Sequence, residues 1–234
     1  MAPEWRVYKD CDSLLEAALE VIRQSEADSG SEFAIVLAGG QTPLALYRML
    51  ARAPMQWQKW QVYFGDERCL PQEDPERNSY QARQALLRQV PIPARHIHIP
   101  PAEHGATEAA ASYCRELSTV GTFDLVLLGL GEDGHTASLF PGHDIGLDAS
   151  SADVLPVFDA PKPPRERISL SARRLSLART VMFLVTGASK REALMRWRQG
   201  RPIPASRIDA QQRHLVLADR AAWPDGVMTN GGKE

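Results

Sequence analysis

The stretch EFAIVLAGGQTPLALYRMLA, residues 32–51, decides the fold class. It opens with a continuous apolar run, which is typical of a strand buried on both faces of a parallel sheet. Two glycines end the run, and the apolar spacing after them predicts a helix with Thr42 as its N-cap and Pro43 in its first turn. A buried strand that turns directly into a helix is the opening half of a strand–helix–strand unit.

The same alternation of strand and helix signals continues along the chain. Further strands are predicted at 60–68, 123–131, 167–171, 180–187 and 213–219. Helices are predicted at 12–29, 42–51, 78–90, 106–120 and 189–199, with Asp12 or Ser13 capping the first and Asn78 or Ser79 the third. We therefore expect an α/β fold, a mostly parallel, Rossmann-like sheet with helices on both faces. We expect one domain over residues 1–234, with a disordered tail at 228–234.

Composition limits the classes of function. The chain has 234 residues, of which 24% are charged, and a net charge of −2, which does not suggest a nucleic-acid or membrane-surface role. No apolar run approaches the roughly 20 residues that span a bilayer, and the N-terminus lacks a signal-peptide core. Three scattered cysteines predict free thiols in a reducing compartment. We expect a soluble, cytoplasmic, monomeric protein that acts on a small molecule, without nucleic-acid or membrane partners.

Four predicted strands end in distinctive polar segments. These are AGGQTP at 38–43, GDERCLP at 65–71, GEDGH at 131–135 and TGASK at 186–190. Because the carboxyl ends of parallel strands share one edge of a sheet, where ligands bind, we expect the four segments to converge. An ordinary loop explains each segment alone, but it explains all four together less well.

Two of these segments predict an anion site. Gly39 and Gly40 let the backbone approach a ligand at a helix N-terminus, where exposed N–H groups and the helix dipole favour anions. Lys190 lies in the first turn of a predicted helix, where a cation is unfavourable unless an anion sits beside it. Arg167 could supply a second, forked cation suited to phosphate. A tight turn and a solvated lysine remain the alternatives, and Arg165, Arg173, Arg174 and Arg179 are expected to form a solvated face.

The other two segments carry acids and bases. His135 lies beside Asp133 in a glycine-framed loop, and a carboxylate can orient a histidine and raise its basicity for general-base catalysis. The acids and arginine of GDER could instead form a local ion pair. His96, His98 and His104 hint at a metal, but no further ligand spacing supports one, so we expect no metal.

Three long motifs carry a resemblance to a known family. LAGGQTPLALYRML at 37–50, VYFGDERCLPQEDPERNSYQAR at 62–83 and FDLVLLGLGEDGHTASLFPG at 123–142 together resemble 6-phosphogluconolactonases. That family hydrolyses 6-phosphogluconolactone to 6-phosphogluconate in the pentose phosphate pathway. It is similar in fold to glucosamine-6-phosphate deaminases and ribose-5-phosphate isomerases. The resemblance runs from the first helix to about residue 218, with one departure at Ala38, where the family often has serine.

The resemblance implies roles for individual residues. His135 would activate water as general base, with Asp133 orienting it and with no metal or organic cofactor. Arg68, with loop N–H groups near Gly131 to Gly134, would stabilise the oxyanion. Asp66 and Glu67 would hold the loop or the sugar hydroxyls. The phosphate would lie against Gly39, Gly40, Gln41, Thr42, Arg167 and Lys190.

Two alternatives stay open. An aminosugar-6-phosphate deaminase or isomerase resembles this chain at DGH, but those enzymes usually carry a glutamate where Phe140 stands and an aromatic residue where Arg68 stands. A non-catalytic sugar-phosphate-binding module would need the anion site but would not need a base beside a carboxylate.

Overall fold

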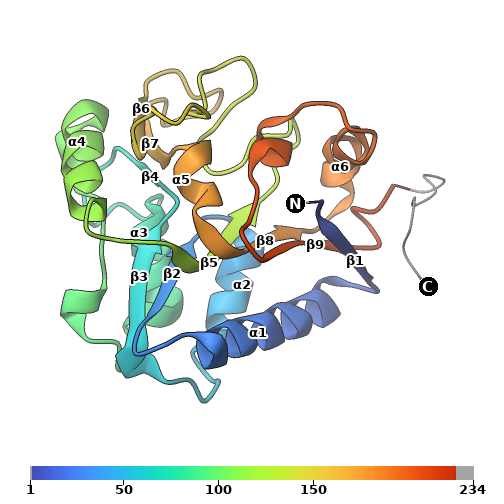
Figure 1. The fold of residues 1–234 in the computed structure, drawn as a ribbon, viewed down its shortest axis with the longest axis horizontal. Helices are drawn as coiled ribbons and strands as arrows, with labels where there is room; N and C mark the ends of the chain where they lie inside the picture. Colours follow the sequence, from blue (N-terminus) through green and yellow to red (C-terminus); the bar gives the residue numbers. More distant parts are fainter. Residues whose placement is uncertain (1, 225–234) are drawn as a thin grey trace.

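Six parallel strands form the central sheet of the computed structural model, which describes residues 2–224. Their order across the sheet is β1-β9-β8-β5-β2-β3 (Figure 1). The strands are β1 (Glu4–Tyr8), β2 (Phe33–Leu37), β3 (Trp60–Phe64), β5 (Phe123–Gly129), β8 (Ala178–Val185) and β9 (Arg213–Asp219). The predicted parallel sheet is confirmed, and β1 is an edge strand that the sequence analysis missed.

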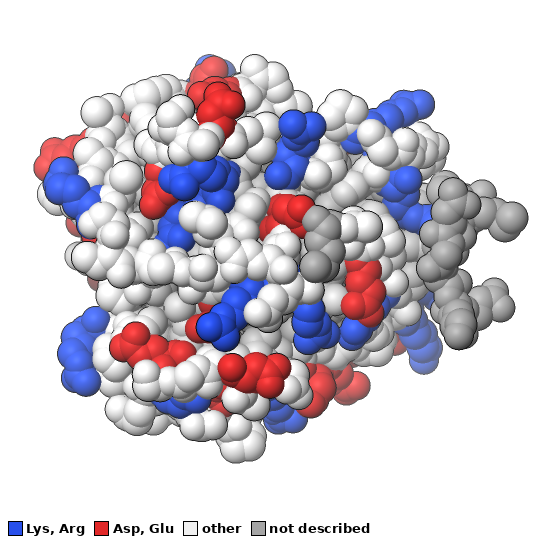
Figure 2. Space-filling view, viewed as in Figure 1, with Lys and Arg blue, Asp and Glu red and all other residues white. Residues whose placement is uncertain are grey.

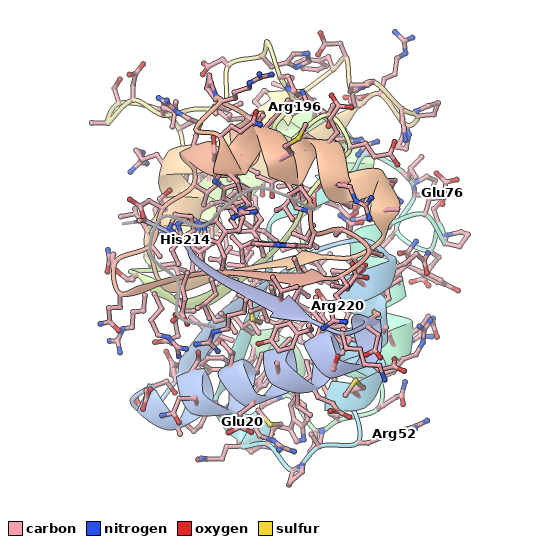
Figure 3. The ribbon with its side chains drawn as sticks, turned by 90° about the vertical axis from the view of Figure 1, so that its right-hand side faces the viewer. Glu20, Arg52, Glu76, Arg196, His214 and Arg220 are labelled. Carbon is pink, nitrogen blue, oxygen red and sulfur yellow. The ribbon has the colours of Figure 1, made fainter. Side chains whose placement is uncertain are left out.

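Helices cover both faces of this sheet. In Figure 1, α1 and α2 lie on one side and α5 and α6 on the other, and the turned view of Figure 3 shows the sheet between α1, marked by Glu20, and α6, marked by Arg196. The helices are α1 (Cys11–Asp28), α2 (Gln41–Leu50), α3 (Asn78–Ala82), α4 (Ala106–Leu117), α5 (Ala172–Ser176) and α6 (Arg191–Arg198). Short helical turns lie at Trp57–Lys59, Arg83–Leu87, Ala94–His96, Ala102–His104, Ala188–Lys190 and Pro204–Arg207.

The strands bury alternate side chains in two separate cores. In β5, Leu125 and Leu127 belong to the core beneath α1 and α2, whereas Val126 and Leu128 belong to the core beneath α4 and α6. Successive strand residues point to opposite faces, so a strand that is apolar throughout must be covered on both sides. This explains the continuous apolar runs of the sequence.

A second, three-stranded antiparallel sheet lies beside the first. It consists of β4 (Asp66–Arg68), β7 (Arg167–Leu170) and β6 (Val154–Val157), in the order β4-β7-β6. The predicted single strand 60–68 is therefore wrong, because the chain leaves the central sheet at Gly65. There the Gly65 N–H still donates to Leu37 O, while Gly65 O accepts from the N–H of Leu170.

The helix starts differ from those predicted. Asp10, not Asp12 or Ser13, is the N-cap of α1 and accepts from the N–H of Ser13 at 3.0 Å. The N-cap of α2 is Gly40, since the helix begins at Gln41, and the hydroxyl of Thr42 contacts the hydroxyl of Thr186 at 2.6 Å. Helix α3 begins after Arg77 and passes into a π-helical turn, so it ends before residue 90.

One of the arginines expected on a solvated face is buried. Arg174 is 2% exposed, with its guanidinium 4.1 Å from the ring centroid of Phe123. Its two terminal nitrogens donate to the carbonyls of Val120 and Gly121, its Nε lies 3.6 Å from Asp153 Oδ2 without a hydrogen bond, and burial lowers its pKa.

Charged side chains of both signs are mixed on the visible face of the molecule, where Lys and Arg are interspersed with Asp and Glu (Figure 2). Within residues 2–224 no helix is long and apolar enough to cross a membrane. The tail predicted at 228–234 lies outside the described residues, and the single domain stays a prediction.

Candidate active site

One pocket of about 410 Å³ lies at the carboxyl edge of the central sheet. All four polar segments of the sequence line it, as the parallel topology predicts. Of the predicted site residues, the pocket is lined by Gly39, Gly40, Gln41, Thr42, Asp66, Arg68, Gly131, His135, Arg167 and Lys190. The other three, Asp133, Gly134 and Glu67, do not line the pocket, but each forms a hydrogen bond with a residue that does.

His135, which lines the pocket, is hydrogen-bonded to Asp133. The Nδ1 atom of His135 lies 2.6 Å from Asp133 Oδ1, which also accepts the backbone N–H of His135 at 3.0 Å. Burial alone would raise the pKa of Asp133, but these two interactions with His135 outweigh it and hold that pKa below its ordinary value. An ionised carboxylate can only accept, so Nδ1 carries the hydrogen and Nε2 of this pocket-lining histidine keeps a free lone pair.

Two glycines of the same loop make room for this pair. A Cβ on Gly131 would lie 2.0 Å from His135 Nδ1, so only glycine lets the imidazole pack against the backbone. Gly134 has φ +94°, and a Cβ there would meet Ile203 at 2.7 Å. The chain can therefore place an acid and a base two residues apart in a turn that side chains would block.

Two N–H groups of this loop, those of Gly131 and Gly134, are used inside the loop. The Gly131 N–H donates to His135 O at 2.8 Å, and the Gly134 N–H donates to Gly131 O at 3.0 Å. These two donors therefore do not point to a substrate, which corrects the expectation for Gly134 and for the N–H of Gly131. Both glycines support the position of His135, and Gly131 also lines the pocket.

The start of α2 forms one wall of the pocket. Gly40, its N-cap, has φ +111° and supplies no side-chain cap, so the first turn keeps its backbone donors for a ligand. The buried Tyr47 hydroxyl donates to Ala38 O at 2.7 Å and accepts the Ala38 N–H at 2.9 Å, which fixes the strand end. A Cβ on Gly39 would lie 2.1 Å from Asn78 Oδ1, so glycine lets Asn78 approach this turn.

Two arginines face each other across the second sheet. Arg68 on β4 and Arg167 on β7 are register partners, and both line the pocket. Directly opposite like charges destabilise a strand pair unless an anion lies between them. Arg167 is 8% exposed and donates to the carbonyls of Lys162 and Pro164, and Arg68 donates to Glu76 O at 2.5 Å. Burial lowers the pKa of Arg167, and neighbouring Arg68 lowers it further, against the opposing effect of Asp66.

Lys190 and Thr186 enter the pocket from the loop after β8. Lys190 is the last residue of the helical turn Ala188–Lys190 and the N-cap of α6, close to the predicted first-turn position. Thr186, which sequence reasoning did not single out, joins this loop to α2 through its contact with Thr42. The N-terminus of α2 and the cation Lys190 therefore lie on segments that contact each other.

Asp66 is anchored by two neighbours. Its Oδ2 accepts from the Ser138 hydroxyl at 2.6 Å and its Oδ1 from the side-chain amide of Asn78 at 3.0 Å. Asn78 also lines the pocket and was predicted only as a helix cap. Ala137, also at the pocket, has φ +48°, a strained backbone for a residue with a Cβ, and such strain clusters at functional sites.

Glu67 supports the site from behind instead of lining it. Its carboxylate accepts the N–H groups of Arg68, Asn78 and Ser79, each at 2.8 Å. Its Oε2 lies 3.4 Å from Nε of Arg77, and both side chains are fully buried. Of the two roles expected for Glu67, the structure supports holding the loop. Contact with sugar hydroxyls does not fit its buried position.

No group of three or more His, Cys, Asp or Glu side chains within residues 2–224 could hold a metal ion. His98 stacks on Tyr63 with ring centroids 4.4 Å apart, and Glu116 and Gln61 contact its two ring nitrogens. Cys69, beside the GDER motif, does not line the pocket, and burial raises its pKa to about 12. That thiol is therefore no candidate nucleophile at neutral pH.

The family model described as glucosamine-6-phosphate isomerases/6-phosphogluconolactonase matches residues 9–217. The chain belongs to this family. A 6-phosphogluconolactonase of Streptomyces coelicolor is 37% identical over 94% of this chain and 93% of its own length, and one of Homo sapiens is 33% identical over 92% and 91%.

Solved structures of this family share the fold. The crystal structure of 6-phosphogluconolactonase from Thermotoga maritima matches with a TM-score of 0.86 and 26% identity, covering 94% of this chain and 100% of that one. A monomeric glucosamine-6-phosphate deaminase is 20% identical with a TM-score of 0.81, covering 94% of this chain and 98% of that one, a likeness that concerns the fold alone.

Proposed function

We propose that the chain hydrolyses 6-phospho-D-glucono-1,5-lactone to 6-phospho-D-gluconate in the oxidative pentose phosphate pathway. The observation that carries the proposal is one pocket that holds a histidine oriented by a carboxylate, His135 with Asp133, together with the cations Arg167 and Lys190. Such a pocket can bind a sugar phosphate and activate water beside it. The names of the relatives support the same substrate.

The reaction needs one base and one water. Nε2 of His135 takes a proton from water as the oxygen attacks the lactone carbonyl, and the tetrahedral intermediate forms. The bond from the carbonyl carbon to the ring oxygen then breaks, and the imidazolium returns its proton to that oxygen as the hydroxyl forms. General-base assistance of this kind is worth about 10²–10⁴-fold in rate. Asp133 keeps the imidazole in the tautomer that the step requires.

The remaining residues bind and stabilise. We assign the phosphate to the first turn of α2 at Gly40, Gln41 and Thr42, with Arg167 and Lys190 as cations. Arg68 stabilises the developing oxyanion. The Asp66 carboxylate, which Ser138 and Asn78 hold in place, accepts a hydrogen bond from a sugar hydroxyl. The ester is already electrophilic, so positioning and these charges suffice without a metal or organic cofactor.

The role of Arg68 can be separated from phosphate binding. An oxyanion contact strengthens only in the transition state, so Arg68→Gln should lower kcat with little change in KM. Removal of a phosphate contact would instead raise KM, the result expected for Lys190→Ala. A rise in KM with unchanged kcat in Arg68→Gln would instead assign Arg68 to phosphate binding.

Substrate comparison tests the proposed function against its alternatives. Wild-type protein should accelerate the disappearance of 6-phosphogluconolactone far above its spontaneous rate and leave glucosamine 6-phosphate unchanged. A deaminase would release ammonia from the aminosugar, but Phe140 fills the place of the expected proton-shuttling glutamate, with its ring 4.9 Å from His135. A binding module would accelerate neither reaction. Either of these results with folded protein would refute the proposal.

We also propose that the enzyme is a cytoplasmic monomer. Sedimentation at micromolar concentration should give a mass near 25.9 kDa, and a stable dimer would refute this part.

A further inference from the structure

We propose that Asp219, a residue outside the pocket, is a positioning residue for the phosphate-binding loop after β8. The proposal rests on the proposed function for the identity of the substrate. Asp219 is the last residue of β9, near the labelled Arg220 in Figure 3, and no part of β9 lines the pocket.

The Asp219 carboxylate is buried and bonded to backbone. The side chain belongs to a residue only 7% exposed, and both of its oxygens lie 3.1 Å from the backbone nitrogen of Gly187. Oδ1 also accepts the N–H of Ala222 at 2.7 Å. Hydrogen bonds to an ionised acceptor are roughly twice as strong as neutral ones, so this carboxylate is a firm anchor for Gly187.

Gly187 connects the Asp219 carboxylate to the residues that line the pocket. It has φ +90°, which only glycine adopts without strain, and its carbonyl accepts the N–H of Lys190 at 3.1 Å. On its other side stands Thr186, whose hydroxyl contacts Thr42 in the first turn of α2. Asp219 therefore fixes the turn that carries both Lys190 and Thr186, two residues that line the pocket.

This arrangement explains why a carboxylate lies close to an anion site. Its charge is turned toward backbone donors behind the loop, so it holds the cation Lys190 in place without forming an ion pair that would compete with phosphate. Asn at this position would keep an oxygen toward Ala222 and Gly187, whereas Ala would leave the Gly187 N–H without its acceptor and let the loop move.

The experiment compares Asp219→Ala with Asp219→Asn and with a matched control, Asp124→Ala. Asp124 also accepts a backbone N–H, that of Ala34 at 2.9 Å, and pairs with Arg179, but at the amino edge of the same sheet. The measured quantities are kcat and KM for the phosphorylated lactone, kcat/KM for unphosphorylated glucono-1,5-lactone, and the Kd of inorganic phosphate by calorimetry.

Asp219→Ala should raise both KM and the phosphate Kd by about 10-fold or more, the size expected for loss of a charge-assisted hydrogen bond. Its kcat should stay within about 3-fold, and its action on the unphosphorylated lactone should not change, because that substrate has no phosphate to hold. Asp219→Asn keeps Oδ1 toward both backbone donors but loses the charge, so its rise in KM and in the phosphate Kd should be smaller than that of Asp219→Ala. Asp124→Ala should leave the phosphate Kd unchanged.

An unchanged phosphate Kd in folded Asp219→Ala, or an equal loss on both lactones, would overturn the proposal. If Asp219→Ala does not fold, Gly187→Ala replaces it, because a side chain at φ +90° strains the same turn. Gly187→Ala must then give the same selective loss of phosphate affinity, or the proposal fails. If the wild type binds phosphate but does not hydrolyse the lactone, the proposed function fails, while the phosphate Kd values still decide the role of Asp219.

Discussion

Replacement of Asp133 tests how the pocket prepares its base. Asp133→Asn should keep the geometry, because the backbone N–H of His135 holds the same Oδ1 atom that faces Nδ1. What the variant loses is charge. A hydrogen bond to a charged group is worth about 1.5–3 kcal/mol and a neutral one about 0.5–1.5 kcal/mol, so the difference is about 1–1.5 kcal/mol.

Solvent reduces that difference, since the Asp133 side chain is 43% exposed. We therefore expect Asp133→Asn to lower kcat by about 2- to 5-fold. Asp133→Ala loses the whole interaction and also the preference for one tautomer, so kcat should fall by about 30- to 100-fold. KM should change little in both variants, because Asp133 does not line the pocket.

The assay follows lactone consumption at neutral pH, with the spontaneous rate subtracted and folding checked by circular dichroism. Glu132→Gln is the matched control, because it removes the adjacent acid, whose side chain is exposed, and it should leave kcat unchanged. Equal kcat in wild type and Asp133→Ala would refute the reasoning, and so would a larger loss in Asn than in Ala.

Three other predictions follow from the surroundings of the site. Gly131→Ala should abolish most of the activity while the protein stays folded, because the new Cβ would lie 2.0 Å from His135 Nδ1; a fully active variant, checked by the same assay, would contradict the geometry. Glu67→Ala should lower the free energy of unfolding by about 3–5 kcal/mol, since it leaves three backbone donors without their acceptor and removes the buried ion pair with Nε of Arg77. Glu67→Gln should cost less. Urea titration measures both, and a loss under 1 kcal/mol in Ala would be contrary evidence. Because the folded-state pKa of Asp133 is below the ordinary 3.8, its stabilising effect is complete above that pH and disappears as the pH falls through the folded-state pKa. The difference in unfolding free energy between wild type and Asp133→Asn should therefore shrink only in acid, and a difference independent of pH would be inconsistent with this.

The strands that could be predicted are those buried on both faces. Residues such as those of β2 and β5 are apolar throughout, and only a covered parallel strand accommodates such a run. Strand β1 was not predicted, because its residues, EWRVY, lie at the sheet edge, where polar and apolar side chains are mixed. Strand β6, VLPV, contains a proline and pairs on one side only, so its signal was equally weak.

The convergence of the site was predictable, but the direction of its side chains was not. Parallel strands bring their carboxyl ends together, so the four polar segments had to meet. Whether neighbours in one segment face the same way depends on local structure. In β4 the two-residue period turns Asp66 and Arg68 into the pocket and Glu67 away from it. Had GDER been recognised as a separate strand, this alternation would have separated Glu67 from the other two.

Contacts between distant segments carried no sequence signal. Thr186 contacts Thr42, which is 144 positions away in the sequence, and Asp66 accepts a hydrogen bond from Ser138, which is 72 positions away. A cap preference or a loop composition cannot report such pairs. They appear only in the folded structure, where these segments are brought together.

We propose that His135 is the general base of a lactonase. The most direct measurement is the rate of 6-phosphogluconolactone hydrolysis by wild type and by His135→Ala under identical conditions. We predict a strong acceleration by wild type that falls by about 10²–10⁴-fold in the variant, while the Kd of inorganic phosphate stays unchanged. An acceleration that survives the substitution would contradict the assignment of His135 as general base.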